Sequence, residues 1–300
     1  MKHVCILLSA YNGEAYIMEQ LDSLKAQKGV DISVVVRDDG SSDRTQSILE
    51  QYQRDGLLSW YSGENKGWAD SFLDLLSRAP DADYYAFCDQ DDIWIEDKLL
   101  RAVECLDRIA GGMKMYCSNL TFFDGVSTAG PIRKGRPSYD KYTCLFSNIA
   151  LGNTIVFDGE LRNLVTSHLP KRVPAHDLWV YQCAMYFGTV FYDDESRILY
   201  RQHQNNQVGI KRSSWERLGV RISRFFSKSK NHSLERSAQL LLHCFGDELS
   251  EHDYRIIRNF ADYRTDFKCK CRVLFNGKYG MGRGLFSDMI LRLKLALNKK

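Results

Sequence analysis

The first hundred residues alternate between short apolar runs and amphipathic segments, and this alternation limits the folds open to the chain more than any other feature. Each run has the length of a buried strand, and the four runs span residues 4–8, 32–36, 57–61 and 84–88. The segment after the first run has apolar residues at helical spacing, at Ile17, Leu21 and Leu24. Strands that are apolar throughout and separated by helices are typical of a parallel sheet covered on both faces. We therefore predict an α/β fold with a mostly parallel central sheet.

Polar segments follow three of the four runs. Ser9–Asn12 follows the first run, Asp38–Asp43 the second and Asp89–Asp92 the fourth. Ligands of open α/β sheets bind at the carboxyl ends of the strands. We therefore expect these three segments to lie together at one edge of the sheet and to form a binding site.

The segment Asp89-Gln90-Asp91-Asp92 places three carboxylates within four residues. Carboxylates this close repel one another unless solvent or a cation lies among them. Hard divalent cations such as Mg2+ take oxygen ligands and share them with substrate phosphates. The segment therefore predicts either a metal site or a solvated turn in which Asp91 or Asp92 caps a helix.

The rest of the chain is less regular and becomes helical toward its end. We predict a helix over residues 178–187 and two short strands at 190–192 and 198–200. Apolar residues then keep helical spacing in three further stretches, which span residues 234–245, 256–267 and 286–297. The sequence thus predicts two regions: an α/β domain over residues 1–210 and a helical appendage over residues 211–300.

Charge separates the same two regions. Residues 211–300 have a balance of +11, whereas residues 1–210 have a balance of −8. A basic helical region fits either an anionic membrane surface or a cap that packs on the body or on a second copy. No motif supports nucleic-acid binding, and no stretch approaches the roughly 18 apolar residues that span a bilayer. The nine cysteines show no repeated CxxC spacing, so we expect free thiols in a reducing cytosol.

Five segments, in this order and at this spacing, make the chain similar to family 2 glycosyltransferases with a GT-A type nucleotide-sugar fold. They are Ser9–Asn12, Asp38–Asp43, Asn65–Gly67, Asp89–Trp94 and His176-Asp177. The resemblance covers roughly residues 1–210. Two further stretches, His176–Trp179 and Leu199–Gly209, are similar to bacterial rhamnosyltransferase-like members. Neither the QxxRW motif nor the membrane helices of processive members are present in the sequence, so we expect a single-addition enzyme.

The resemblance implies a nucleoside diphosphate sugar as donor and places its nucleotide on the first three segments. Tyr11 would stack on a pyrimidine, and Asp39 would accept the ring N–H of uracil or thymine. The resemblance places Asp38 nearer the ribose or the fold. For these residues an ordinary loop tyrosine and a plain Asp-Gly turn remain the alternatives. The resemblance adds further nucleotide-sugar contacts at Ser9, Asn12, Asn65, Gly67 and Asp89, with helix capping as the alternative at Asn65 and Gly67.

The resemblance also assigns the metal and the base. Asp91 would bind Mg2+ or Mn2+, and Asp89 would support the metal or orient the ribose. Asp177 would be the general base that deprotonates the acceptor hydroxyl. The alternative for Asp177 is the N-cap of the following helix, and His176 competes for the role of base.

Four residues outside these assignments are candidates for contacts with substrate. His203 would touch the diphosphate or the metal, with Arg201 as a phosphate partner. The alternative at this point is a loop-closing histidine beside a surface arginine. Trp179 and Asn153 would line the acceptor pocket. Trp94 is expected in the core.

Together these features predict an inverting, metal-dependent glycosyltransferase. The favoured donor is dTDP-L-rhamnose, and the acceptor is a saccharide or a lipid-linked saccharide of cell-surface polysaccharide synthesis. A second hypothesis is the same fold with UDP-galactose or UDP-glucose, and a third is a non-catalytic nucleotide-sugar or carbohydrate binding module. We expect a cytoplasmic location at the inner face of the cell membrane, where residues 211–300 contact the surface or pack in a homodimer.

Overall fold

The computed structural model describes residues 1–202, 233–280 and 285–297, and the chain divides into two compact units. The first unit comprises Met1–Arg136 and Ala150–Gln202, and the second comprises Pro137–Ile149 and the chain from His203 onward. The sequence did not predict that residues 137–149 belong to the second unit. The predicted boundary near residue 210 lies outside the described residues and stays a prediction.

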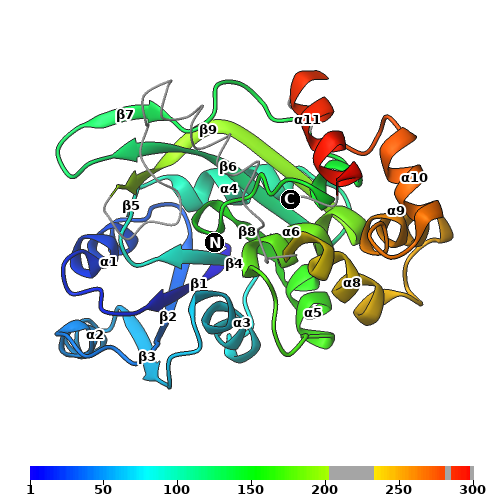
Figure 1. Cartoon of the computed structure of the whole chain (residues 1–300). Helices are drawn as coiled ribbons and strands as arrows, with labels where there is room; N and C mark the ends of the chain where they lie inside the picture. Colours follow the sequence, from blue (N-terminus) through cyan, green and yellow to red (C-terminus); the bar gives the residue numbers. More distant parts are fainter. Residues whose placement is uncertain (203–232, 281–284, 298–300) are drawn as a thin grey trace. The chain divides into compact units, whose positions relative to one another are not determined.

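The first unit is built on one curved sheet with helices packed on it (Figure 1). Its strands run in the spatial order β3-β2-β1-β4-β8-β6-β9-β5, with β7 paired to β6. They are β1 His3–Ala10, β2 Asp31–Asp38, β3 Leu58–Ser62, β4 Tyr84–Asp89, β5 Ile93–Trp94, β6 Lys114–Phe123, β7 Thr128–Pro131, β8 Val156–Asp158 and β9 Thr189–Arg201. The strands β3, β2, β1 and β4 are parallel, as are β6 and β9, whereas β5, β7 and β8 pair antiparallel. The predicted mostly parallel α/β sheet is confirmed.

The register of β1 with its neighbours brings the polar segments to one edge. Ala10 lies opposite Asp38 of β2, and Ser9 lies opposite Asp89 of β4. From β1 the chain proceeds to β2 and β3 on one side, and then crosses to β4 on the other side of β1. The strand order therefore reverses beside β1, which is the position where α/β sheets form a binding crevice. The expectation that the three polar segments meet is confirmed.

The helices pack on the sheet with their apolar faces, as the spacing of apolar residues in the sequence predicts. In α1, Ile17, Leu21 and Leu24 are fully buried. The strand residues Val4–Leu8 beneath are also fully buried, and each such aliphatic side chain stabilises the fold by about 1.5–3 kcal/mol. The helices of this unit are α1 Ile17–Lys25, α2 Thr45–Arg54, α3 Trp68–Arg78, α4 Lys98–Asp107, α5 Gly159–Ser167 and α6 His176–Phe187.

Strand β9 corrects the prediction of two short strands at residues 190–192 and 198–200. It is one strand of 13 residues that pairs with β6 from Thr189 to Arg201, with register shifts on either side of Asn119 in β6. The polar sequence in its middle suggested a break. The structure instead buries Asp193, which accepts hydrogen bonds from Arg101 (2.8 Å) and from the Tyr116 hydroxyl (3.2 Å). A paired carboxylate is tolerated in a strand interior where an unpaired one is not.

The described part of the second unit is helical, as predicted, with α8 Ser233–Phe245, α9 Glu251–Ala261, α10 Phe267–Phe275 and α11 Leu285–Ala296. Residues 137–149 pack on these helices: the Phe146 ring lies 4.5 Å from the Phe260 ring, and Lys141 forms an ion pair with Asp253 at 2.7 Å. Within the described residues, no helix is both long and apolar enough to cross a bilayer.

The predicted helix over residues 256–267 is wrong at its end. Helix α9 ends at Ala261, and α10 begins at Phe267. Asp266 caps α10 by accepting the N–H groups of Lys268 and Cys269. Tyr263 keeps an apolar position outside the helix because its ring is buried and its hydroxyl donates to Glu235 at 2.8 Å.

Candidate active site

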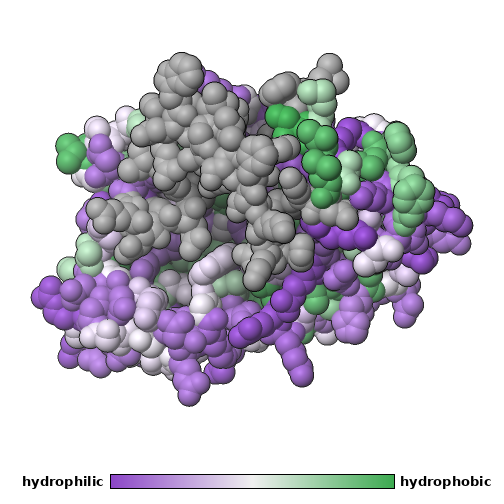
Figure 2. Space-filling model, in the orientation of Figure 1, coloured by the Kyte–Doolittle hydropathy of each residue, from purple (hydrophilic) through white to green (hydrophobic). Residues whose placement is uncertain are grey.

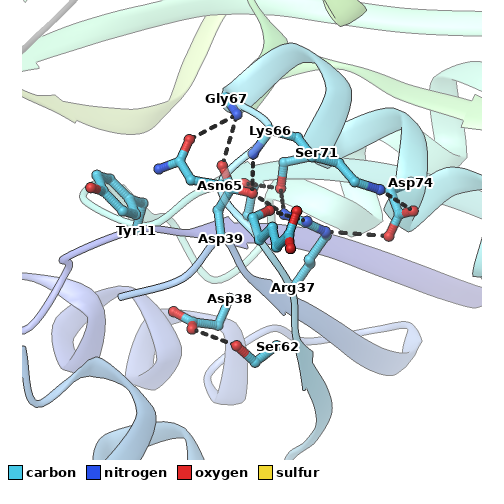
Figure 3. Close-up of polar contacts among 12 residues, drawn as sticks. Tyr11, Arg37, Asp38, Asp39, Ser62, Asn65, Lys66, Gly67, Ser71 and Asp74 are labelled. Carbon is cyan, nitrogen blue, oxygen red and sulfur yellow. Dashed lines mark hydrogen bonds and ion pairs between the residues drawn. The ribbon is translucent and has the colours of Figure 1, made fainter. Parts of the chain in front are cut away.

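The Arg37–Asp39 ion pair anchors the turn after β2. Both side chains are buried, with relative exposures of 1% and 2%. Asp39 pairs with the Arg37 guanidinium and accepts the backbone N–H groups of Lys66 (3.0 Å) and Gly67 (2.9 Å) (Figure 3). Arg37 also reaches the Ser71 hydroxyl and Asp74. Asp39 thus fixes the loop that leads into α3, and the ion pair with Arg37 was not anticipated from the sequence.

Asp38 is fully buried and holds the same turn from below. Its carboxylate accepts the N–H of Ser41, the side-chain amide of Gln46 (2.7 Å) and the hydroxyl of Ser62 (3.1 Å; Figure 3). Of the two places that the resemblance gave for Asp38, the ribose or the fold, these contacts favour the fold.

Asn65 and Gly67 shape the start of α3. Gly67 has φ 80°, a left-handed conformation that glycine adopts without strain, and it is the residue before the first helical position. The Asn65 side chain accepts the Gly67 N–H at 3.1 Å. Apart from its chain neighbours, no atom of the described residues lies within 4 Å of a Cβ added at Gly67. The chain therefore passes open space here, which leaves room for a ligand beside the backbone.

Tyr11 presents its ring to solvent while its backbone is fixed. The residue is 48% exposed, and Figure 3 draws its ring outside the hydrogen-bond network around Asp39. The Gln90 amide clamps the Tyr11 backbone, because it accepts the N–H at 2.9 Å and donates to the carbonyl at 3.0 Å. Tyr11 is therefore held in place by the acidic segment itself.

Ser9 and Asn12 use their side chains to join loops. The Ser9 hydroxyl bonds the Ser71 hydroxyl at 2.6 Å. Asn12 has φ 46°, and its side-chain oxygen accepts the Ser42 N–H at 2.9 Å. The first contact ties the end of β1 to α3, and the second ties the loop after β1 to the loop after β2.

The acidic segment is held by residues distant in sequence. Asp92 is fully buried and accepts the backbone N–H of Arg201 (3.1 Å) and the side-chain amide of Asn153. Burial, and then the charges of Asp89 and Asp91, raise the pKa of Asp92 well above its usual range. The Arg201 guanidinium donates to the Asp91 carbonyl at 3.0 Å.

These contacts differ from the roles that the sequence suggested for Arg201 and Asn153. Arg201 was expected to bind phosphate and Asn153 to line the acceptor pocket. Their exposures are only 6% and 2%, and both support the acidic loop. His203, the remaining candidate of this region, lies outside the described residues.

At the carboxyl end of β4, Asp89 lies within electrostatic range of two other carboxylates, Asp91 and Asp177. Burial, and then the charges of Asp91 and Asp177, raise the pKa of Asp89 to about 7. Asp177 comes from α6, so the fold brings the predicted base into electrostatic range of the predicted metal-binding segment. Ala175 is the N-cap of α6, whereas Asp177 lies in the first turn with one oxygen on the Leu178 N–H at 2.7 Å. The capping alternative for Asp177 therefore does not describe its position.

His176 does not share the environment of Asp177. Its ring is 3% exposed, stacks on Phe72 at 4.1 Å and meets the edge of Phe87 at 4.8 Å. Burial lowers the pKa of His176 to about 3. A neutral imidazole in an aromatic core is a poor candidate for the base, which leaves Asp177.

Two tryptophans and a lysine belong to the core around the site. Trp179 is fully buried, so it does not line an acceptor pocket as the sequence suggested, and Trp94 is buried as expected. The Lys98 ammonium lies 3.5 Å from the centre of the Trp94 ring. Burial lowers the pKa of Lys98 to about 7, against the charges of Cys88 and Asp92, which act to raise it. No sequence pattern singled out Lys98.

The donor set fits a divalent cation that is completed by substrate. Among the described residues, no group of three or more His, Cys, Asp or Glu side chains is arranged to hold a metal ion. Asp89 and Asp91 nevertheless lie close enough that, after burial, the Asp91 charge is the next largest cause that raises the Asp89 pKa. Mg2+ is commonly held by one or two carboxylates together with substrate phosphates. The residues present therefore suit a metal that arrives with a diphosphate.

Known glycosyltransferases are similar in sequence to this chain. The family model "Glycosyl transferase family 2" matches residues 5–145. A "dTDP-rhamnosyl transferase RfbG" of Shigella flexneri is 30% identical over 237 residues, which are 74% of this chain and 81% of the relative. A "putative teichuronic acid biosynthesis glycosyltransferase TuaG" of Bacillus subtilis is 34% identical over 103 residues, or 34% of this chain and 40% of the relative.

Solved structures are similar to the fold at low sequence identity. Residues 1–349 of Staphylococcus aureus TarS, in complex with UDP-GlcNAc, align with a TM-score of 0.58 and 20% identity over 93% of this chain and 78% of that one. The mannosyltransferase PcManGT from Pyrobaculum calidifontis, in complex with GDP-Man and Mn2+, aligns with a TM-score of 0.53 and 18% identity over 98% of this chain and 79% of that one. With its matched motifs, its parallel sheet and a relative aligned over most of both chains, this chain belongs to the family 2 glycosyltransferases and is an enzyme with a GT-A type fold.

Proposed function

We propose that the enzyme transfers L-rhamnose from dTDP-L-rhamnose to a saccharide acceptor, with inversion at the anomeric carbon and with a divalent metal. The observation that carries the proposal is that Asp89 lies in electrostatic range of Asp91 and Asp177, at the sheet edge where β1 and β2 lead into Tyr11 and Asp39. The name of the Shigella flexneri relative supports rhamnose as the sugar. The name of the Bacillus subtilis relative supports a role in cell-surface polysaccharide synthesis.

Each group has a distinct task in this proposal. The Tyr11 ring stacks on the thymine. The Asp39 carboxylate already accepts the N–H groups of Lys66 and Gly67, and it accepts the thymine ring N–H with a remaining lone pair. Asp91, supported by Asp89, would hold Mg2+ or Mn2+, and the metal would neutralise charge on the leaving diphosphate. Asn65 and Gly67 let the backbone approach the donor. Ser9, Asn12 and Asp38 build the wall of the nucleotide site, and His203 stays a predicted diphosphate contact.

Asp177 accepts the proton of the attacking hydroxyl. It is partly exposed, it lies in the first turn of α6, and its buried neighbour His176 is neutral. Inverting transfer needs only one such base, because attack and departure occur on opposite faces of the sugar. A β-linked donor then gives an α-linked product.

A UDP-hexose donor is the second candidate. The TarS complex with UDP-GlcNAc favours it, since a carboxylate at Asp39 accepts the ring N–H of uracil as well as that of thymine. A thermal-shift comparison of dTDP-L-rhamnose, UDP-glucose, UDP-galactose and UDP-GlcNAc separates the two, because a bound ligand raises the melting temperature by mass action.

Donor hydrolysis tests the metal and the base. We expect Asp91→Ala to abolish the stimulation of donor hydrolysis by Mn2+, and Asp177→Asn to bind donor without transferring the sugar. Asp31→Asn, an exposed carboxylate at the opposite end of β2, is the matched control. Metal-stimulated hydrolysis by Asp91→Ala at the wild-type rate would show that the metal assignment is wrong.

The second unit is proposed to contact an anionic membrane at the cytoplasmic face, where a lipid-linked acceptor would be present. Exposed apolar residues lie on α11 at Met289 and Leu293, and Leu297 follows the last residue of the helix (Figure 2). Helix α10 adds exposed Phe267 and Phe275. Amphipathic helices with basic residues bind such surfaces. Packing against a second copy is the alternative, and it predicts a dimer in solution.

A further inference from the structure

Trp68 is a large exposed ring for which the proposed reaction has no role so far. It is the first residue of α3 and is 45% exposed, whereas Trp94 and Trp179 are 2% and 0% exposed. A single exposed apolar side chain is ordinary on a protein surface. The position of this one, between the two halves of the site, is what needs an explanation.

Trp68 connects the nucleotide side of the site to the base. The residue before it, Gly67, donates its N–H to Asp39. The Trp68 ring meets the edge of the His176 ring with 5.5 Å between their centres, and the next residue after His176 is Asp177. The segment at Trp68 thus contacts both Asp39, the residue proposed to bind the nucleobase, and α6, the helix that carries Asp177.

The surroundings support the indole without covering it. His176 is fixed by its contacts with Phe72 and Phe87, so the ring beside Trp68 is rigid. Among the described residues, no atom outside the neighbouring residues lies within 4 Å of a Cβ built at Gly67, so the backbone that leads into Trp68 borders open space. A rigid, exposed ring next to open space is a suitable platform for stacking.

A pyranose ring has an apolar face, made of its axial C–H groups, that packs on aromatic rings as other apolar surfaces do. A 6-deoxyhexose adds a methyl group to that apolar surface. We infer that Trp68 is the platform on which the donor's sugar ring lies, between the diphosphate at Asp91 and the base Asp177. The inference rests on the proposed function, and it assigns Trp68 as a specificity residue for the sugar rather than for the nucleotide.

Binding of dTDP and of dTDP-L-rhamnose to the full-length protein, each with Mg2+, tests the inference. Trp68→Gln is expected to bind dTDP-L-rhamnose about tenfold more weakly and dTDP as tightly as wild type, since aromatic stacking contributes about 0.5–1.5 kcal/mol and 1.4 kcal/mol is a factor of ten. Trp68→Phe keeps a ring and is expected to retain most of the affinity. Met18→Gln removes an exposed apolar side chain of similar exposure, 47%, from α1 and is expected to change neither ligand.

Tryptophan fluorescence gives a second readout that a purely structural role would not move. Sugar-dependent quenching, taken as the difference between dTDP-L-rhamnose and dTDP, is expected in wild type and not in Trp68→Phe. Equal binding of both ligands by Trp68→Gln and wild type overturns the inference, and so does an equal loss of both. If the wild type binds UDP and a UDP-hexose rather than dTDP-L-rhamnose, the rhamnose donor is wrong. The affinities of Trp68→Gln for UDP and for the UDP-hexose then test the role of Trp68 in the same way. Wild type that binds no nucleotide sugar overturns the proposed function as well.

Discussion

His176 is predicted to make the enzyme sensitive to mild acid through its burial alone. The imidazole has an ordinary pKa of 6.5, and burial lowers it to about 3 in the folded state. Neither ring nitrogen has a hydrogen-bond partner among the residues that the structure describes. The unfolded chain therefore binds a proton below pH 6.5 that the folded chain does not accept until the pH approaches 3. The stability from this group is complete above pH 6.5 and is lost as the pH falls.

The magnitude follows from the size of the pH interval. Between pH 6.5 and pH 5 the imidazole takes up a proton in the unfolded chain but not in the folded chain. This interval spans about 1.5 pH units, and each unit corresponds to about 1.36 kcal/mol of unfolding free energy. The wild type is therefore expected to lose about 2 kcal/mol of unfolding free energy over this interval through His176. His176→Leu replaces the ring by an apolar side chain and removes this loss.

Urea unfolding at pH 7.5 and at pH 5 measures the effect. The decrease in unfolding free energy between the two pH values is expected to be about 2 kcal/mol smaller in His176→Leu than in wild type. Taking this difference removes the contributions of Asp89 and Asp92, which are present in both proteins. His168→Leu, which removes an exposed imidazole, is expected to follow wild type. The same pH dependence in wild type and His176→Leu would refute the argument that His176 is neutral and buried.

Three further predictions concern the support of the site and the second unit. Gly152→Ala is expected to lower the kcat for transfer, because the new Cβ would lie 2.8 Å from the His176 ring nitrogen and the ring cannot move; Gly277→Ala, which meets no atom within 4 Å, is the control. Arg201→Lys is expected to reduce metal-stimulated donor hydrolysis about tenfold, since it removes guanidinium bonds worth about 1.5 kcal/mol that hold the acidic loop. Leu293→Asp is expected to reduce co-sedimentation of the full-length protein with anionic vesicles, whereas unchanged vesicle binding with a shift from dimer to monomer would favour packing between copies.

The polar ends of the strands were predictable because their position depends on a local pattern. A strand that is apolar throughout belongs inside a sheet, and parallel strands in such a sheet end at the same edge. This reasoning brought Tyr11, Asp39 and Asp91 together before any coordinates. The same local reasoning failed at Asp193, where a polar residue inside a strand is compensated by Arg101, 92 residues away.

The partners of the site residues depend on contacts that no short pattern encodes. Arg201 reaches Asp92 across 109 residues, and Asn153 reaches it across 61. The sequence placed both side chains on substrate because polar residues near a motif usually face solvent. Their burial is decided by the path of β9 and of the short segment Gly152–Thr154 beside the acidic loop.

The sequence by itself determined the α/β fold, the edge of the sheet that forms the site and the carboxylates gathered there, because periodicity and motif order are properties of neighbouring residues. The tertiary structure decided which of those groups remain available to a ligand. Asp38, Asn153 and Arg201 are used within the fold, and His176 is neutral inside an aromatic cluster, whereas Tyr11 and Trp68 keep exposed rings. The physical reason is that burial and partner choice depend on the packing of segments far apart in the chain.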